Sequence, residues 1–213
     1  FQYLSREGLI RLDPTLNIES PRLGRPLPRT LTEAEVESLL AAPDTATRLG
    51  MRDRTMLELL YATGLRVSEL VNLRLDQVNL RQGVVRVIGK GDKERLVPLG
   101  EEAADWLARY LREVRADFFH GDPDATLFPS NRGRPLTRQT FWYAIKRYAV
   151  AAGISKPLSP HVLRHAFATH LLENGTDIRY IQEILGHANL KTTEIYTHVT
   201  QHGLERIRSP LDA

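Results

Sequence analysis

Apolar side chains recur at helical spacing along most of the chain. In "LTEAEVESLL" the apolar residues Val36, Leu39 and Leu40 share one helix face. Just before them, Thr32 and Glu35 form the capping-box pattern that begins a helix. The same periodicity, often bounded by a capping residue or a glycine, predicts further helices over residues 52–64, 65–75, 101–119, 137–153, 159–175, 177–187 and 191–199. We therefore expect a mainly helical chain.

One segment has a different pattern. In "GVVRVIGKGDKERLVPL", residues 83–99, β-branched side chains flank a Gly-Lys-Gly-Asp sequence, which is typical of a β-hairpin and its turn. The fold class predicted from the whole pattern is mainly α, with one small antiparallel β-sheet or hairpin. The sequence contains no internal repeat and no low-complexity segment.

The first 29 residues differ from the rest of the chain. They end in "DPTLNIESPRLGRPLPR", which contains four prolines and several basic residues and has the composition of a linker. We therefore expect residues 1–27 to be the tail of a preceding domain with a linker, and residues 28–213 to be one domain. Because the chain begins at Phe1 without a methionine, we expect it to be a piece of a longer protein.

Composition narrows the class of protein. The chain has no cysteine, which excludes disulfide bonds and thiolate metal sites. No apolar run approaches the ~18 residues that a membrane-spanning helix requires. The net charge is only +3, but 24 of the 29 basic residues are arginines, whose planar fork matches the oxygens of a phosphate. Arginine enrichment also follows from a GC-rich genome, so composition alone only hints at a polyanionic partner.

The segment "SPHVLRHAFATHLL", residues 159–172, carries the densest group of chemically active side chains. His161 and Arg164 lie three residues apart, and His161 and His165 lie four apart, so each pair shares a helix face. The two histidines would need a third ligand to hold a metal, and the sequence His-Glu-x-x-His is absent. Near a helix start, His161 and Arg164 could instead bind a phosphate. They could also be ordinary surface residues, and His165 could be buried and hydrogen-bonded.

Two further segments place a basic residue one or two positions after a glycine. In "ATGLRVSEL", Arg66 follows a glycine helix stop and begins the next helix, with Glu69 on the same face. A guanidinium held by a carboxylate is suited to binding a phosphate, although an ordinary surface ion pair has the same spacing. In "IGKGDKERLVPL", Lys90 lies at the hairpin tip between two glycines. There it could enter a groove, donate a proton or simply form a charged turn.

The last such segment is "LGHANLKTTEIYTHV". His187 directly follows Gly186, a predicted helix stop, and Tyr196 comes nine residues later. Tyr196 lies in a polar setting of threonine, lysine and histidine rather than in an apolar stripe, so packing does not explain it. A phenol has a pKa near ~10, so it needs a base to act as a nucleophile at neutral pH.

The order of these features along the chain is specific. The chain resembles the tyrosine recombinase (phage integrase) family, and within it the bacterial Xer recombinases. The resemblance lies in the order of its motifs: an arginine, a lysine at a β-turn, His-x-x-Arg, Leu-Gly-His and a tyrosine nine residues after that histidine. The stretches that carry the resemblance are "YATGLRVSEL", "VIGKGDKERLVPLG", "LSPHVLRHAFATHLL" and "LGHANLKTTEIYTHV". The resemblance implies the tyrosine recombinase catalytic domain fold for residues 28–213. It makes residues 1–27 the tail of that family's N-terminal core-binding domain.

The resemblance also implies an active site. Seven positions match the family pattern without departure: Arg66, Glu69, Lys90, His161, Arg164, His187 and Tyr196. The match makes the two arginines the groups that bind the scissile phosphate, the lysine the general acid on the leaving 5′-oxygen, and the tyrosine the nucleophile. The two histidines complete the site, the first as acceptor of the phenol proton, and the glutamate supports its neighbouring arginine.

The activity implied by the resemblance is site-specific DNA recombination through a 3′-phosphotyrosine, with no metal, ATP or other cofactor. A Xer identity implies double-stranded DNA with a dif-type site as substrate, a sister Xer recombinase in a heterotetramer, and an FtsK-type DNA translocase as activator. It also implies resolution of chromosome dimers at cell division by a cytoplasmic, nucleoid-associated protein, which the lack of cysteine suits. The alternatives are a mobile-element or integron integrase, a type IB topoisomerase, a non-catalytic DNA-binding module and, more remotely, a metal-dependent nuclease.

Overall fold

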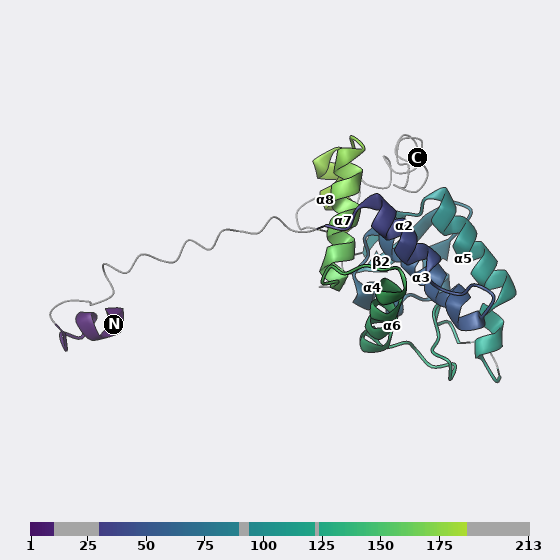
Figure 1. The fold of residues 1–213 in the computed structure, drawn as a ribbon, viewed down its shortest axis with the longest axis horizontal. Helices are drawn as coiled ribbons and strands as arrows, with labels where there is room; N and C mark the ends of the chain where they lie inside the picture. The colour runs from purple at the N-terminus through teal and green to yellow at the C-terminus, as the bar shows by residue number, and fades with distance from the viewer. Residues whose placement is uncertain (11–29, 90–93, 122–123, 187–213) are drawn as a thin grey trace.

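The computed structural model describes residues 1–10, 30–89, 94–121 and 124–186 (Figure 1). Of Gln2, Pro160 and His161 it describes the backbone alone. In this part of the chain the α-helices are α1 (Gln2–Arg6), α2 (Glu33–Ala41), α3 (Arg48–Thr63), α4 (Val67–Val71), α5 (Glu101–Glu113), α6 (Arg138–Ala151), α7 (Pro160–Glu173) and α8 (Ile178–Leu185). The 3-10 helices and strands are η1 (Leu75–Gln77), η2 (Arg115–Phe118), β1 (Val78–Asn79), β2 (Val84–Ile88) and β3 (Glu94–Pro98). The predicted fold class, mainly α with one small sheet, is confirmed.

Local sequence signals set where the helices begin and end. The Thr32 hydroxyl accepts a hydrogen bond from the Glu35 backbone N–H at 3.2 Å, and the Glu35 carboxylate accepts one from the Thr32 N–H at 2.8 Å. Ser159 caps α7 by accepting a hydrogen bond from the Val162 N–H at 3.3 Å. Gly64 ends α3 in the left-handed conformation, with φ at 59°. The capping box and the glycine stop are both as predicted.

α4 is shorter than the helix predicted over residues 65–75. Beyond its end, the Leu127 N–H donates to the Leu73 carbonyl at 2.9 Å, and the Leu75 N–H donates to the Ala125 carbonyl at 2.8 Å. These backbone hydrogen bonds to a distant segment replace the ones that would continue the helix. The C-terminal part of this predicted helix is therefore wrong, because a long-range pairing overrides the local apolar period.

The three strands form one antiparallel sheet in the order β1, β2, β3. In the hairpin of β2 and β3, Val85 pairs with Val97, and Val87 pairs with Arg95. The three valines are buried, so Arg95 stands on the face of β3 that meets the core. The predicted hairpin is confirmed in its strands, whereas residues 90–93, which contain its turn, lie outside the described residues.

α3 lies in the hydrophobic core and is buried along most of its length. α2, α5 and α7 pack against it, and α4 follows from its end (Figure 1). The large, fully buried aromatic side chains are Tyr61, Tyr110, Phe118, Phe128, Phe141 and Phe167. Among the described residues, no helix is both long and apolar enough to cross a membrane. Because α3 and α7 share one close-packed core, the side chains at their ends are held in fixed relative positions.

A buried histidine, His170 of α7, connects α3 with the segment that precedes α2. The Tyr61 hydroxyl and Nδ1 of His170 are 2.7 Å apart, and Nε2 of His170 is 2.9 Å from the Leu31 carbonyl oxygen. Because a carbonyl only accepts, we assign the proton to Nε2, and Nδ1 then accepts the hydroxyl proton. The suggestion that His165 is buried is wrong: it is exposed, because it lies off the face of α7 that buries Phe167 and His170.

Candidate active site

Arg66 occupies the junction between α3 and α4. It is the N-cap residue of α4, two positions after the glycine that ends α3. Its backbone N–H donates to Oε2 of Glu69 at 2.8 Å, and its Nη1 donates to Oε1 at 2.9 Å. The predicted pairing of Arg66 with Glu69 is therefore confirmed. The Arg66 side chain is 44% exposed, so its guanidinium remains accessible to a ligand.

Gly64 is required at this junction for two reasons. Its φ of 59° lies in the left-handed region that favours glycine. In addition, a methyl group at Gly64 would lie 2.5 Å from Cδ1 of Phe167 and 2.8 Å from Cδ2 of Leu185, which is well inside van der Waals contact. The missing side chain thus allows α7 and α8 to approach the end of α3 closely.

Arg164 reaches the same junction from α7. Its Nη1 donates to the Gly64 carbonyl at 2.5 Å, and its Nη2 donates to the Leu185 carbonyl. Burial, together with the positive charge of Arg66, lowers the pKa of Arg164 to about 10. The guanidinium is still protonated at neutral pH. A bound anion would offset the repulsion between the two arginines. The pair is therefore suited to bind one phosphate that contacts both guanidiniums.

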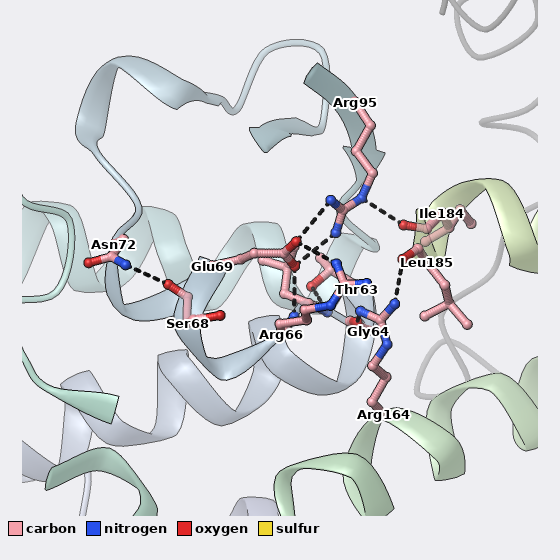
Figure 2. Close-up of polar contacts among 11 residues, drawn as sticks. Thr63, Gly64, Arg66, Ser68, Glu69, Asn72, Arg95, Arg164, Ile184 and Leu185 are labelled. Atoms are coloured by element: carbon pink, nitrogen blue, oxygen red, sulfur yellow. Dashed lines mark hydrogen bonds and ion pairs between the residues drawn. The ribbon is translucent and has the colours of Figure 1, made fainter. Parts of the chain in front are cut away.

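Glu69 is shared with a third arginine, Arg95 of β3 (Figure 2). Nη1 and Nη2 of Arg95 donate to the two carboxylate oxygens of Glu69 at 3.0 Å and 2.8 Å. Burial alone would raise the pKa of the Glu69 carboxyl, but hydrogen bonds from Arg95 and Arg66 outweigh it and hold that pKa below its ordinary value. Glu69 is therefore a fixed anion between two guanidiniums.

Two of these arginines also hold the end of α8. Nε of Arg95 donates to the Ile184 carbonyl at 3.0 Å, and Arg164 donates to the next carbonyl, that of Leu185. Gly186 then ends α8 with φ at 66°. The last carbonyls of a helix carry partial negative charge and lack partners within the helix, so guanidiniums are favourable there. The end of α8 is thus tied to β3 and to α7.

An open cleft of about 520 Å³ lies beside Arg66. One side is formed by α4 and the segment after it, and the other by the end of β2. The lining residues are Arg66, Ser68, Glu69, Asn72, Leu73, Arg74, Gln77, Val87, Ile88 and Gly89. The exposed guanidinium at this cleft and the open shape suit an extended polyanion better than an enclosed small molecule.

The structure describes the side chains of three predicted site residues and brings all three together: Arg66, Glu69 and Arg164. Four predicted side chains lie outside the described ones: Lys90, His161, His187 and Tyr196. The backbone of His161 belongs to the first turn of α7. Gly89 and Gly186, which directly precede the lysine and the second histidine in the chain, are both described.

The sequence analysis missed Arg95. The signal for it was present, because strand alternation in "ERLVP" places Arg95 on the same face as Val97, which packs into the core. A buried arginine needs acceptors for the N–H groups of its guanidinium, either a carboxylate or backbone carbonyls. The period of the strand therefore marks Arg95 as a residue that needs acceptors inside the fold, although it does not say that Glu69 is one of them.

Comparison with known proteins gives a consistent result. The phage integrase family matches residues 29–202. Tyrosine recombinase XerD of Pseudomonas putida is 61% identical over 98% of this chain and 70% of the relative. The crystal structure of XerA recombinase shares 40% identity and a TM-score of 0.68, over 84% of this chain and 63% of that one. XerH bound to a palindromic difH substrate, in a post-cleavage complex, shares 30% identity and a TM-score of 0.68, over 87% of this chain and 54% of that one.

The chain thus spans less than two thirds of these two solved chains, though 70% of the XerD relative. The stretches "RQGVVRVIGKG" and "RQTFWYAIKRYAV" resemble XerD, in agreement with that relative. The ordered motifs, the helical fold with its small sheet and the family match over most of the chain lead to one assignment. The chain belongs to the phage integrase family, the tyrosine recombinases.

Proposed function

We propose that this chain carries the catalytic domain of a Xer site-specific recombinase of the XerD type, which cuts and rejoins DNA strands at a dif-type site. The observation that supports it most is the convergence of Arg66 and Arg164 beside Gly64, from two helices far apart in the sequence. Two guanidiniums in a fixed geometry are what a phosphodiester needs when charge builds on its non-bridging oxygens. The XerD relative and the difH substrate of XerH support the same class of DNA site.

The proposed reaction uses the seven residues of the family pattern. The phenolic oxygen of Tyr196 attacks the scissile phosphorus, an oxygen–phosphorus bond forms, and the bond from phosphorus to the 5′-oxygen breaks. His161 accepts the phenol proton, and Lys90 donates a proton to the leaving 5′-oxygen. Arg66, Arg164 and His187 stabilise the charge on the phosphate oxygens.

The covalent 3′-phosphotyrosine conserves the energy of the broken bond. A 5′-hydroxyl of another strand can then attack it, which restores a phosphodiester and releases Tyr196. We therefore propose a reaction that draws on no ATP and no metal. Glu69 takes no part in proton transfer, and its role is to hold the Arg66 guanidinium in place.

The proposed partners follow from the Xer assignment. Residues 1–27 would be the end of a core-binding domain that clamps the duplex together with residues 28–213. The active assembly would be a heterotetramer with a sister Xer recombinase on two DNA sites, activated by an FtsK-type translocase. Its task would be the resolution of chromosome dimers on the nucleoid, in the cytoplasm, at cell division.

A suicide substrate tests the chemistry. The full-length protein and its sister recombinase are incubated in EDTA with a dif-type duplex nicked beside the scissile phosphate, so that the released strand end diffuses away. We expect a covalent protein–DNA adduct that survives denaturation, and none from Tyr196→Phe, which loses only a hydroxyl. In a parallel reaction with Mg²⁺, free DNA ends without an adduct would indicate a metal-dependent nuclease. A gel shift without cleavage in both reactions would indicate a DNA-binding module. Either result would overturn the proposal.

A further inference from the structure

Arg95 faces the protein rather than the accessible cleft. It donates three hydrogen bonds, two to Glu69 at 2.8 Å and 3.0 Å and one from Nε to the Ile184 carbonyl at 3.0 Å. Its side chain is 10% exposed, against 44% for Arg66. It is therefore not a third phosphate-binding arginine, and its role must be exerted through the groups that it contacts.

Stability alone does not require an arginine here. Burying a guanidinium and a carboxylate has a desolvation cost that their attraction roughly offsets, and apolar residues of similar size often replace such pairs without loss. Arg95 also shares its strand face with Val97, so apolar residues in place of both Arg95 and Glu69 would suit the site. What an arginine adds is a fixed orientation of the carboxylate, because the planar guanidinium binds both carboxylate oxygens at once.

We propose that Arg95 is a positioning residue for DNA cleavage, which acts through Glu69 on Arg66. The inference rests on the proposed function. Each oxygen of Glu69 contacts both arginines: Oε1 accepts from the side chains of Arg66 and Arg95 at 2.9 Å and 3.0 Å. Oε2 accepts from the Arg66 backbone N–H and from Arg95, both at 2.8 Å. Arg95 therefore fixes the rotation of the carboxylate, and the carboxylate fixes the aim of the Arg66 guanidinium (Figure 2).

The same side chain sets the spacing between α4 and the end of α8. A methyl group at Gly186 would lie 3.4 Å from Cδ, Nε and Cζ of Arg95, so the backbone of Gly186 packs directly beside the guanidinium. Nε of Arg95 holds the carbonyl of Ile184 in the preceding turn. Loss of Arg95 would thus loosen both the aim of Arg66 and the anchor of α8, while leaving the exposed cleft chemically unchanged.

The test measures the rate of the covalent step separately from folding. Adduct formation on the nicked suicide duplex is followed in a single turnover at saturating DNA, with the full-length protein and the unaltered sister recombinase. For Arg95→Met we expect near-normal DNA affinity and full amplitude, with a rate constant about 10²-fold lower, as for misplaced groups in other sites. Arg95→Lys should recover only part of the rate, because one ammonium cannot hold both carboxylate oxygens and the carbonyl.

Arg86→Met is the matched control. Arg86 lies in β2 of the same sheet and is 40% exposed, and its hydrogen bond and ion pair, at 3.2 Å, are to Glu94 of the neighbouring strand. We expect it to react at the normal rate. Equal slowing in Arg86→Met, or a normal rate with reduced amplitude in Arg95→Met, would overturn the proposal in favour of a merely structural role. If the methionine variant does not fold, the rate of Arg95→Lys decides by the same criteria.

A double-variant cycle tests the route of the effect. If Arg95 acts through Glu69, the variant with both Glu69→Gln and Arg95→Met should react about as slowly as Glu69→Gln alone. A rate reduced by the product of the two single effects would show that Arg95 acts elsewhere. An absent adduct in the unaltered protein would instead refute the proposed function, and this inference with it.

Discussion

Nη1 of Arg164 donates a hydrogen bond to the carbonyl oxygen of Gly64 at 2.5 Å, which ties α7 to the end of α3 two residues before Arg66. The two arginines of the candidate site are therefore not independent surface residues. One is anchored on the backbone that positions the other. A carbonyl is available to Arg164 because a glycine ends α3 there, so the backbone conformation of one residue decides where both guanidiniums lie.

Gly64→Ala should destabilise the protein more than the same change at another helix end. The left-handed backbone costs an alanine about 1 kcal/mol, and the clash with Phe167 and Leu185 should bring the total to about 2–4 kcal/mol. The matched control is Gly153→Ala, with φ at 71° and no atom within 4 Å of the added methyl group. Urea unfolding of both variants gives the comparison. Equal losses would mean that close packing at Gly64 contributes nothing.

The sequence predicts the local features of the fold and of the site and misses the long-range ones. The capping pattern of Thr32 and Glu35, the stop at Gly64 and the spacing of Arg66 and Glu69 each depend on residues within one helical turn, so a reader of the sequence finds them. Arg95 binds partners 26 and 89 positions away, and no local pattern names them. The helix predicted over residues 65–75 ends early for the same reason, because its last residues pair with the distant segment 125–127.

His170 and His165 should differ sharply in their effect on stability. His170→Leu would leave the buried Leu31 carbonyl and the Tyr61 hydroxyl without their partner, at a cost of about 2 kcal/mol or more in the free energy of unfolding. His165→Leu, on the exposed face of α7, should change that free energy by less than about 0.5 kcal/mol. Denaturant titration measures both. A larger effect at His165 would contradict the assignment of the buried histidine.

The pKa of Glu69 predicts how stability falls in acid. It lies below the ordinary value of 4.5 in the folded protein, so folding favours the carboxylate. The resulting contribution is present in full above that ordinary value and is lost as the pH falls through the lower folded pKa. Between neutral pH and about pH 3, Glu69→Gln should therefore lose less stability than the unaltered protein. Parallel loss in both proteins, measured by urea unfolding across this range, would mean that Glu69 is not held as an anion.

The leaving group separates Lys90 from the arginines. Arg66→Ala and Arg164→Ala remove donors that stabilise charge in the transition state, so each should slow cleavage by ~10²-fold or more. Lys90→Ala should slow cleavage of normal DNA but recover on a substrate with sulfur in place of the 5′-bridging oxygen, because a thiolate leaves without a proton. The arginine variants should remain slow on that substrate, since the phosphate charge still needs them. Single-turnover rates on the paired substrates provide the measurement. Equal recovery of all three variants would make Lys90 another phosphate ligand rather than the general acid.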